Sequence, residues 1–268
     1  MSQQIIGLGE WFGTPPGQYL LAWEQAQFDH AVVDLFGFNA VQLGMPEVAT
    51  LQSNRMPQRW LSLPEEFATA MPLSRVSVPG SGIEHRVHLV TDAAALPFPA
   101  ASLDLVVLPH TLELSADPHQ VLREVERVLV PDGRVVIAAF NPVSLWGWRQ
   151  GRAQWSQRLG MQSLGISRPY LPDVGQFIGP WRLRDWLRLL SFEVESERRG
   201  IYRPAVRTEK WLQRMAWMDR LGARWWPILG AVYFVVAVKR VRGMRLLGPA
   251  WRPRKAARGA PVSLAQRR

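Results

Sequence analysis

Cysteine is absent from this chain of 268 residues, which excludes disulfide bonds and thiolate metal sites. Histidine is scarce, and its five copies show no ligand spacing with nearby acidic residues, so we expect no metal centre. The histidines are His30, His85, His88, His110 and His119. We also expect no secretory signal, because residues 1–4 lack a basic side chain and Glu10 interrupts the apolar stretch that follows. These absences favour a cytoplasmic protein.

A long apolar run is missing as well. Residues 225–238 form the most apolar stretch, but Pro227 interrupts it. A membrane-spanning helix needs about 20 consecutive apolar residues, so this stretch is too short. We therefore expect no transmembrane span. The length and the spacing of apolar segments indicate one domain with one large core.

Acidic residues are missing from the C-terminal end. Twelve of the 32 basic residues and none of the 22 acidic residues follow Asp219, although the chain as a whole carries a net charge of +10. Two interpretations stay open. The basic end contacts nucleic acid or an anionic membrane surface through phosphate groups, or it is a solvated, disordered segment rich in Arg, Pro, Gly and Ala.

The most informative stretch that is present covers residues 85–148. Short apolar runs at 87–90 and 105–108 are typical of buried strands. Asp117 and Pro118 predict a helix start, because the aspartate can cap free N–H groups and proline needs no donor there. Residues 131–133 predict a turn, and 135–140 a third strand. The apolar positions of the intervening helix are Val121, Leu122, Val125, Val128 and Leu129.

This order of strand, helix and strand predicts an α/β fold. Continuous apolar strands joined by a crossover helix imply a parallel sheet that is buried on both faces. Such sheets bind ligands at the carboxyl ends of their strands. Asp92, His110, Glu113 and Asn141 are all expected at that edge. Each also has a simpler interpretation, since Asp, Asn and Glu often form turns or caps and a histidine often bonds a neighbouring loop.

The segments DAAALPFP, SLDLVV and DPHQVLREVERVLVPDGRVVIAAF resemble the second half of class I S-adenosylmethionine-dependent methyltransferases that act on small molecules. The resemblance implies an enzyme with S-adenosyl-L-methionine as its cofactor. It also implies a Rossmann-like, seven-stranded, mostly parallel sheet with helices on both faces. The last strand, over 232–238, would be antiparallel beside the fifth strand, with 192–197 as its partner.

The resemblance assigns roles to individual residues. Asp92 would accept from the adenine amino group, and Asp104 would introduce the fourth strand. His110 would contact the cofactor, and its ordinary pKa near neutrality makes it a candidate base for an acceptor that loses a proton. The other implied cofactor contacts are Gly44, Ala93, Leu96, Pro97 and Phe98, and the implied substrate-side residues are Glu113, Asn141 and Trp146.

The first half of the chain departs from the family pattern. Gly44 is the best candidate for the cofactor turn, but Gln42 stands where an acidic residue is usual, and Met45 and Pro46 replace the flexible glycines. A second candidate with Asp34 and Gly37 is less suitable, because residues 17–36 predict an amphipathic helix. A ribose ligand is expected after a strand at 60–63, from Glu65 or Glu66. The altered turn leaves a second hypothesis open, that of a catalytically inactive binding or regulatory protein.

The remaining segments complete the prediction. Residues 1–245 would form the methyltransferase-like domain, 146–180 an insertion that covers the site, 181–190 a helix, and 246–268 a disordered basic tail. Most of the thirteen tryptophans are expected in the core and the cover. Trp146, Trp148 and Trp155 follow the fifth strand, where they would wall an apolar or aromatic acceptor.

Overall fold

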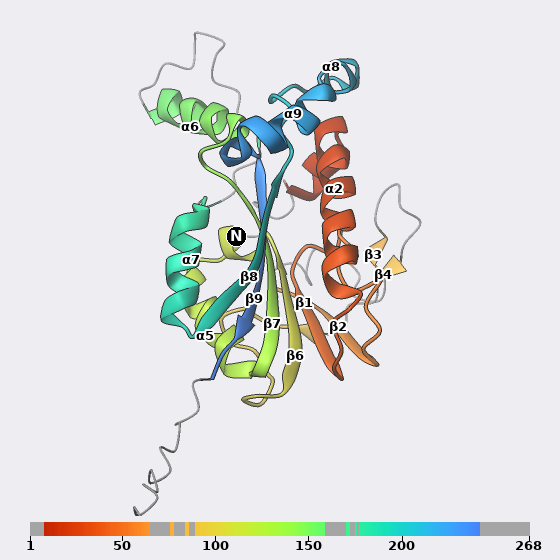
Figure 1. Cartoon of the computed structure of the whole chain (residues 1–268), viewed down its shortest axis with the longest axis vertical. Coiled ribbons are helices and arrows are strands. Elements are labelled where there is room, and N and C mark those ends of the chain that lie inside the picture. The colour runs from red at the N-terminus through yellow and green to blue at the C-terminus, as the bar shows by residue number, and fades with distance from the viewer. Residues whose placement is uncertain are drawn as a thin grey trace, which may run out of the picture.

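The computed structural model of the chain describes residues 8–64, 76–77, 84–85, 89–158, 170–171, 175 and 177–241. Its centre is a seven-stranded sheet in the order β5-β2-β1-β6-β7-β9-β8. Figure 1 shows the sheet with helices on either side. The strands are β1 (Asn39–Leu43), β2 (Gln58–Leu63), β5 (Leu89–Val90), β6 (Leu103–Pro109), β7 (Leu129–Phe140), β8 (Phe192–Gly200) and β9 (Val232–Lys239). A separate antiparallel pair consists of β3 (Val76–Ser77) and β4 (Glu84–His85).

Strand pairing confirms the predicted sheet. The pairs β5-β2, β2-β1, β1-β6 and β6-β7 are parallel, and β9 runs antiparallel to both β7 and β8. The predicted turn at 131–133 lies inside β7, where the pairing with β6 jumps from Leu129 to Arg134. Asp132 has a left-handed φ of 61° at this irregularity. The chain therefore turns within an element that resumes regular pairing at Arg134.

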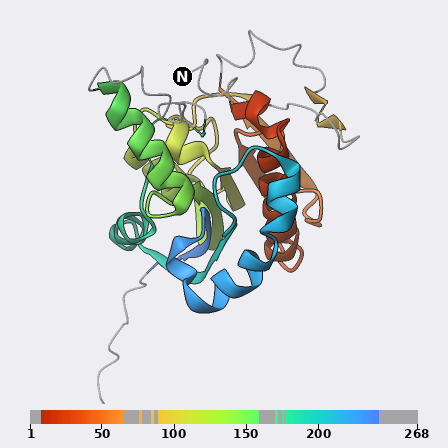
Figure 2. The ribbon, with the colours of Figure 1, turned by 90° about the horizontal axis from the view of Figure 1, so that it is seen from above.

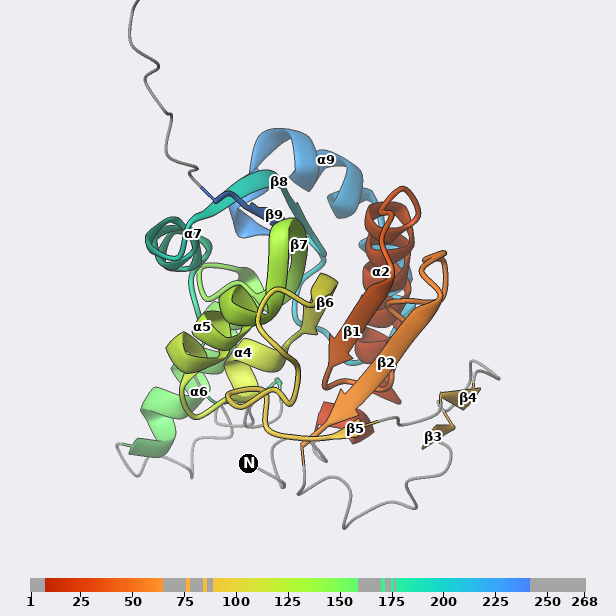
Figure 3. The ribbon, with the colours of Figure 1, turned by 90° about the horizontal axis from the view of Figure 1, so that it is seen from below.

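Helices cover both faces of the sheet. Figures 1 and 3 show α2 (Pro15–Val32) on one side, and α5 (Pro118–Val128) with α7 (Pro180–Leu189) on the other. The predicted helix over 17–36 thus starts two residues earlier, at Pro15, and ends four residues earlier, at Val32. The remaining named helices are α4 (Thr111–Leu114), α6 (Leu145–Arg158), α8 (Glu209–Arg214), α9 (Trp217–Trp225) and the 3-10 turn η2 (Pro227–Leu229).

Helix α5 forms as its sequence predicts. The Asp117 side chain accepts a hydrogen bond from the Gln120 backbone N–H at 3.0 Å, and Pro118 occupies the first turn. This cap satisfies one of the free donors at the helix start. The apolar face of α5 is completely buried against the sheet beside α7. The buried side chains of α5 are Val121, Leu122, Val125 and Val128.

The tryptophans do not follow the prediction of core and cover packing. Trp146 is 1% exposed, and Trp11 packs against it with ring centroids 5.9 Å apart. Seven others are exposed by more than a third of their surface. These are Trp148, Trp155, Trp181, Trp211, Trp217, Trp225 and Trp226. Composition alone does not reveal the direction of a side chain, which here depends on helices that cross the outside of the sheet.

Candidate functional site

The turn after β1 contains two left-handed residues in succession. Gly44 has φ 78° and Met45 has φ 43°, so the chain reverses sharply where β1 ends. Glycine adopts this conformation at little cost, whereas a side chain such as that of Met45 is strained there. Met45 is nonetheless buried, which fixes it in place. Strain of this kind is concentrated at functional sites.

Gln42 organises this turn from inside. Its buried side-chain amide donates to the backbone oxygens of Met45 at 2.7 Å and Val48 at 2.9 Å, and approaches that of Gly44 at 3.2 Å. Its carbonyl oxygen accepts from the Thr50 hydroxyl at 2.7 Å. An acidic side chain could not donate to these three backbone oxygens. The glutamine is therefore matched to a turn that points carbonyl groups inward.

Glu47 carries a polar atom that the turn leaves without a partner. Its Oε2 is enclosed and has no hydrogen bond among the described residues. Burial raises the pKa of Glu47 to about 7, while a bond from its own backbone N–H opposes the shift. A buried carboxylate without a partner is costly, so this oxygen is suited to a cationic ligand group.

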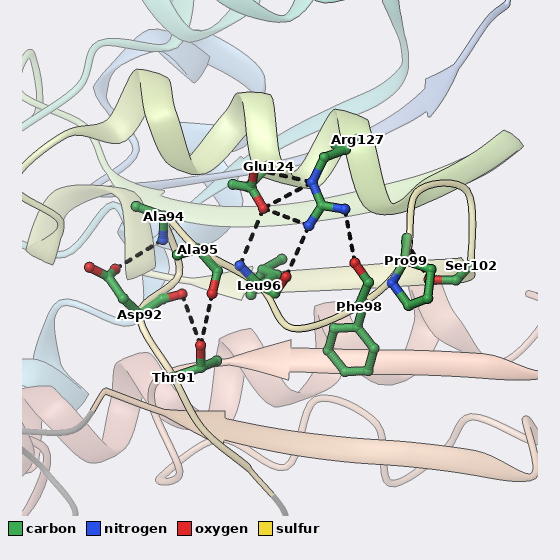
Figure 4. Close-up of polar contacts among 10 residues, drawn as sticks. All are labelled: Thr91, Asp92, Ala94, Ala95, Leu96, Phe98, Pro99, Ser102, Glu124 and Arg127. Carbon is green, nitrogen blue, oxygen red and sulfur yellow. Dashed lines mark hydrogen bonds and ion pairs between the residues drawn. The ribbon is translucent and has the colours of Figure 1, made fainter.

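The turn after β5 presents Asp92. The Asp92 Oδ1 accepts from the Ala94 N–H at 2.9 Å, and the Thr91 hydroxyl donates to the Ala95 oxygen at 2.9 Å. Figure 4 shows these bonds, and the second carboxylate oxygen of Asp92 has no contact among the residues drawn. Asp92 is exposed, and Ala93 beside it is half-buried. The Asp92 carboxylate is therefore a solvent-exposed hydrogen-bond acceptor at the end of β5.

An ion pair on α5 holds the rest of that segment. Glu124 accepts from the Leu96 N–H at 3.2 Å, and the Arg127 guanidinium donates to the oxygens of Leu96 and Phe98, each at 2.9 Å. Glu124 and Arg127 bond each other at 2.8 Å (Figure 4). The Arg127 hydrogen bond lowers the pKa of Glu124. We refer to Glu124 and Arg127 as the α5 clamp.

The α5 clamp positions apolar side chains beside Asp92. Leu96 is 4% exposed and belongs to the core between the sheet and α5. The Phe98 ring packs against Trp60 of β2 with centroids 5.4 Å apart. Pro97 is exposed between them. The segment is therefore a rigid apolar edge rather than a loose loop.

His110 follows β6 and lies between two carboxylates. Its Nε2 is 2.7 Å from Glu24 Oε1 of α2, and its Nδ1 is 2.8 Å from Glu113 Oε2 of α4. All three side chains are 0% exposed. Glu113 also accepts from the Phe140 N–H at 2.5 Å. Both ring nitrogens are thus engaged, and the ring is not open to a substrate in this arrangement.

The electrostatics of this group favour a charged imidazole. Burial alone would lower the pKa of His110, but attraction to Glu24 and hydrogen bonds to Glu113 and Glu24 outweigh it and raise the pKa to about 10. Burial raises the pKa of Glu113, while the bond with His110 opposes that shift. His110 also has a left-handed φ of 51°, an uncommon conformation for a non-glycine residue. The neighbouring Thr111 hydroxyl donates to the Leu43 oxygen at 2.5 Å and joins this turn to the end of β1.

The predicted substrate-side residues make structural contacts. The Asn141 amide donates to the backbone oxygens of Ile228 at 2.7 Å and Gly230 at 2.9 Å, which ties the end of β7 to the start of β9. The Trp146 indole donates to the Arg203 oxygen at 2.8 Å inside an aromatic cluster with Trp11. Both side chains are 1% exposed. Neither faces an open site among the described residues.

The structure brings only some of the predicted residues together. The turns that contain Gly44 and His110 are joined by the hydrogen bond from Thr111 to Leu43, whereas Asp92 lies at the end of β5, on the far side of β2. Asp104 lies at the opposite end of the sheet, where it accepts from the N–H groups of Phe38 and Asn39. Glu65 and Glu66 lie outside the described residues.

Sequence reasoning missed four of the side chains that shape these turns. Glu124 and Arg127 had a signal, since opposite charges three residues apart on a helix can pair. Glu24 had none, because its partner His110 is 86 residues away. Glu47 follows the predicted turn directly but does not match the usual motif. Within the described ranges, no group of three or more potential ligand side chains could hold a metal ion, and no helix is long and apolar enough to cross a membrane.

Comparison with known proteins identifies relatives. The methyltransferase domain family matches residues 68–137. The chain is 32% identical over 192 residues to the uncharacterized protein YafS of Escherichia coli K12, covering 72% of this chain and 68% of that protein. It is 34% identical over 141 residues to the demethylmenaquinone methyltransferase of Thermus thermophilus, covering 49% of this chain and 63% of that protein. The chain thus spans less than two thirds of the Thermus relative.

A solved structure shares the fold. A S-adenosylmethionine-dependent methyltransferase of Thermotoga maritima matches with a TM-score of 0.54 at 15% identity. The match covers 90% of this chain and 100% of that one. Identity this low supports the architecture alone.

Proposed function

The chain belongs to the class I S-adenosylmethionine-dependent methyltransferases, and we propose that its turns after β1 and β5 hold the two ends of the cofactor. Its activity is therefore methyl transfer from S-adenosylmethionine. The family match favours an enzyme over the inactive binding protein that the altered first turn suggested. The unpartnered carboxylate oxygen of Glu47 carries the proposal for cofactor binding.

The adenine end would lie at the turn after β5. The second oxygen of Asp92 is placed to accept from an amino group, and the half-buried Ala93 adjoins it. Leu96 and Phe98 would flank the ring, because the α5 clamp keeps their backbone fixed. Supporting this, β1, β2 and β5 are adjacent and parallel, so the carboxyl ends of neighbouring strands lie about 5 Å apart.

The methionine end would lie at the turn after β1. S-adenosylmethionine carries an ammonium group at this end, and Glu47 offers an enclosed oxygen that lacks a partner. Gly44 allows the backbone to turn sharply beside it. The residues present are thus suited to the cofactor, although the acidic group comes from Glu47 and not from position 42.

Methyl transfer depends more on the alignment of the acceptor with the methyl group than on proton transfer by the protein. The sulfonium of the bound cofactor supplies the leaving group, so the protein has to place the acceptor behind the methyl group and exclude water. Both nitrogens of His110 are engaged, so we propose that it positions the turns after β6 and β1 instead of acting as the base. The acceptor would then attack the methyl group with its own lone pair, without His110 as a base.

Three expectations from the sequence remain predictions. Residues 246–268 would contact nucleic acid or an anionic membrane surface, and the protein would be cytoplasmic. Trp148 and Trp155 are exposed on α6 and stay candidates for contact with an apolar acceptor.

Calorimetric titration of S-adenosylmethionine tests the two ends separately. Asp92→Ala and Glu47→Gln should each weaken binding about tenfold, the loss expected for one charge-assisted hydrogen bond. Glu10→Gln, an exposed substitution, should bind like wild type. Because burial raises the pKa of Glu47 to about 7, wild-type affinity should increase as pH rises through that value, and Glu47→Gln should lose this dependence. No heat from wild type at any pH would refute cofactor binding.

A further inference from the structure

The outward face of α9 combines aromatic and basic side chains. Trp217, Arg220, Leu221, Arg224 and Trp225 are exposed and recur at intervals of three and four residues, which places them on one helical face. Trp225 is 71% exposed and Trp217 is 49% exposed. Large apolar side chains in such a row mark an interaction surface, because monomeric proteins rarely expose them together. We refer to these five residues as the α9 face.

Neighbouring elements extend the α9 face. Trp211 on α8 is 49% exposed, and the Arg214 guanidinium lies 5.5 Å from the centre of its ring. Trp226 and Ile228 follow α9 in the chain and are also exposed, by 37% and 46%. Exposed apolar groups therefore occur on three consecutive elements, and cations accompany them on α8 and α9.

The acidic residue of α9 points away from this surface. Asp219 accepts from the Tyr19 hydroxyl at 2.5 Å and from the Arg203 guanidinium at 2.8 Å. It also accepts from the Tyr202 N–H at 3.1 Å. These bonds consume the carboxylate and fix α9 to α2 and to the end of β8. The α9 face is left with positive charge only.

The helix is held close to the body of the protein. A Cβ added at Gly222 would approach the Tyr202 ring to 2.4 Å, so only glycine permits this packing. Helix α8 is anchored by its buried Leu212 side chain, whereas most of its other residues are exposed. The α9 face is thus presented on a fixed support, not on a loose segment.

The position of α8 and α9 relates this surface to the cofactor turns. Strand β8 runs in the same direction as β7, because both are antiparallel to β9. The chain between the end of β8 and the start of β9 therefore lies at the carboxyl edge of the sheet. Figures 1 and 2 show α8 and α9 at that end, together with α6. The surface and the candidate site share one edge.

We infer that the α9 face docks on an anionic lipid bilayer. Tryptophan prefers the boundary between headgroups and acyl chains, and arginine extends along it to phosphate groups. An interfacial helix needs this combination of apolar anchors and cations. Charge complementarity identifies the lipid as anionic. The enzyme would then hold its cofactor edge against a membrane, where an acceptor dissolved in lipid is within reach.

Vesicle flotation tests this inference with the full-length protein. Wild type should float with vesicles of equal phosphatidylglycerol and phosphatidylcholine, and its tryptophan emission should shift to shorter wavelength. Arg220→Gln with Arg224→Gln should lower the partition coefficient about thirtyfold, since each basic residue at an anionic surface contributes about fivefold. Leu221→Ser with Trp225→Ser should lower it at least about tenfold.

A matched double variant on α7 controls for lost hydrophobicity. Trp181→Ser with Leu189→Ser removes the same residue types, which are 55% and 77% exposed, and should float like wild type. Failure of wild type to float would overturn the inference. Wild-type flotation by both α9 variants would also overturn it and would assign the contact to residues 242–268. Tighter binding to a uniform-sequence RNA than to the vesicles, lost in the arginine variant, would identify the partner as RNA instead. All of these readouts are independent of cofactor binding.

Discussion

The turn after β1 is held by one buried, neutral amide, whereas the turn after β5 is held by a charged pair that is partly exposed. Gln42 reaches three backbone oxygens of its own turn from below. Glu124 and Arg127 reach the backbone of 96–98 from a neighbouring helix. Both arrangements fix a strand end at the same edge of the sheet. The first depends on complete burial, and the second tolerates water.

This difference predicts unequal sensitivity to substitution. Removing a partner from a buried backbone group exposes the full desolvation cost of that group, about 1–3 kcal/mol. Exposed ion pairs contribute less, about 0–1 kcal/mol, apart from their bonds to backbone. Substitutions that remove side-chain bonds in the turn after β1 should therefore lower the free energy of unfolding more than those in the turn after β5.

The largest effect is expected at Gln42. Gln42→Ala leaves the oxygens of Met45 and Val48 without their donor, and should lower the free energy of unfolding by about 4 kcal/mol. Gln42→Glu keeps the size but cannot donate, so it should be nearly as destabilising. Urea unfolding measures both, with exposed Gln52→Ala as the control. If Gln42→Glu were as stable as wild type and bound the cofactor more tightly, position 42 would be the missing acidic ligand after all.

The turn after β6 extends the comparison to a buried charge. His110 has a pKa raised to about 10, above its unfolded value near 6.5. The stability it contributes is thus complete below about pH 6.5 and is lost as pH rises through about 10. Glu24→Gln should lower the free energy of unfolding at pH 6 by about 3 kcal/mol and flatten its decline toward pH 10. Urea titrations across this range test it, with Glu10→Gln as control, and an unchanged slope in Glu24→Gln would contradict the charged assignment.

The smallest effect is expected at the α5 clamp. Arg127→Met keeps most of the side-chain stem but loses the bonds to Leu96 and Phe98, and should cost about 1 kcal/mol of stability. Its cofactor affinity should fall about tenfold, because the segment beside Asp92 loses its support. Arg123→Met on the exposed side of the same helix is the matched control. Equal losses in both variants would show that the effect comes from charge and not from the backbone bonds.

The sequence predicted the fold better than the site. Local signals sufficed for α5, whose cap at Asp117 and apolar face are set by neighbouring residues. They also sufficed for the strand ends that carry Gly44 and Asp92. The environment of His110 was not predictable, because Glu24 comes from a helix far away in the chain. The role of Gln42 was not predictable for a related reason, since it depends on the direction of the backbone carbonyl groups in the turn after β1.

The burial of the tryptophans was also not predictable from residue type. Trp146 is 1% exposed, whereas Trp225 is 71% exposed. Helical spacing on α9 revealed the outward row only once its inward contacts, Gly222 and Asp219, were known.

The late position of β9 in the chain has a consequence for folding during synthesis. This strand lies between β7 and β8, although both precede it in the sequence. Until residues 232–239 have left the ribosome, β7 has an unpaired edge and β8 has no place in the sheet. Such edges promote aggregation of nascent chains, and pairing between distant segments is slow. A chain interrupted before Val232 should therefore aggregate instead of forming a smaller stable domain.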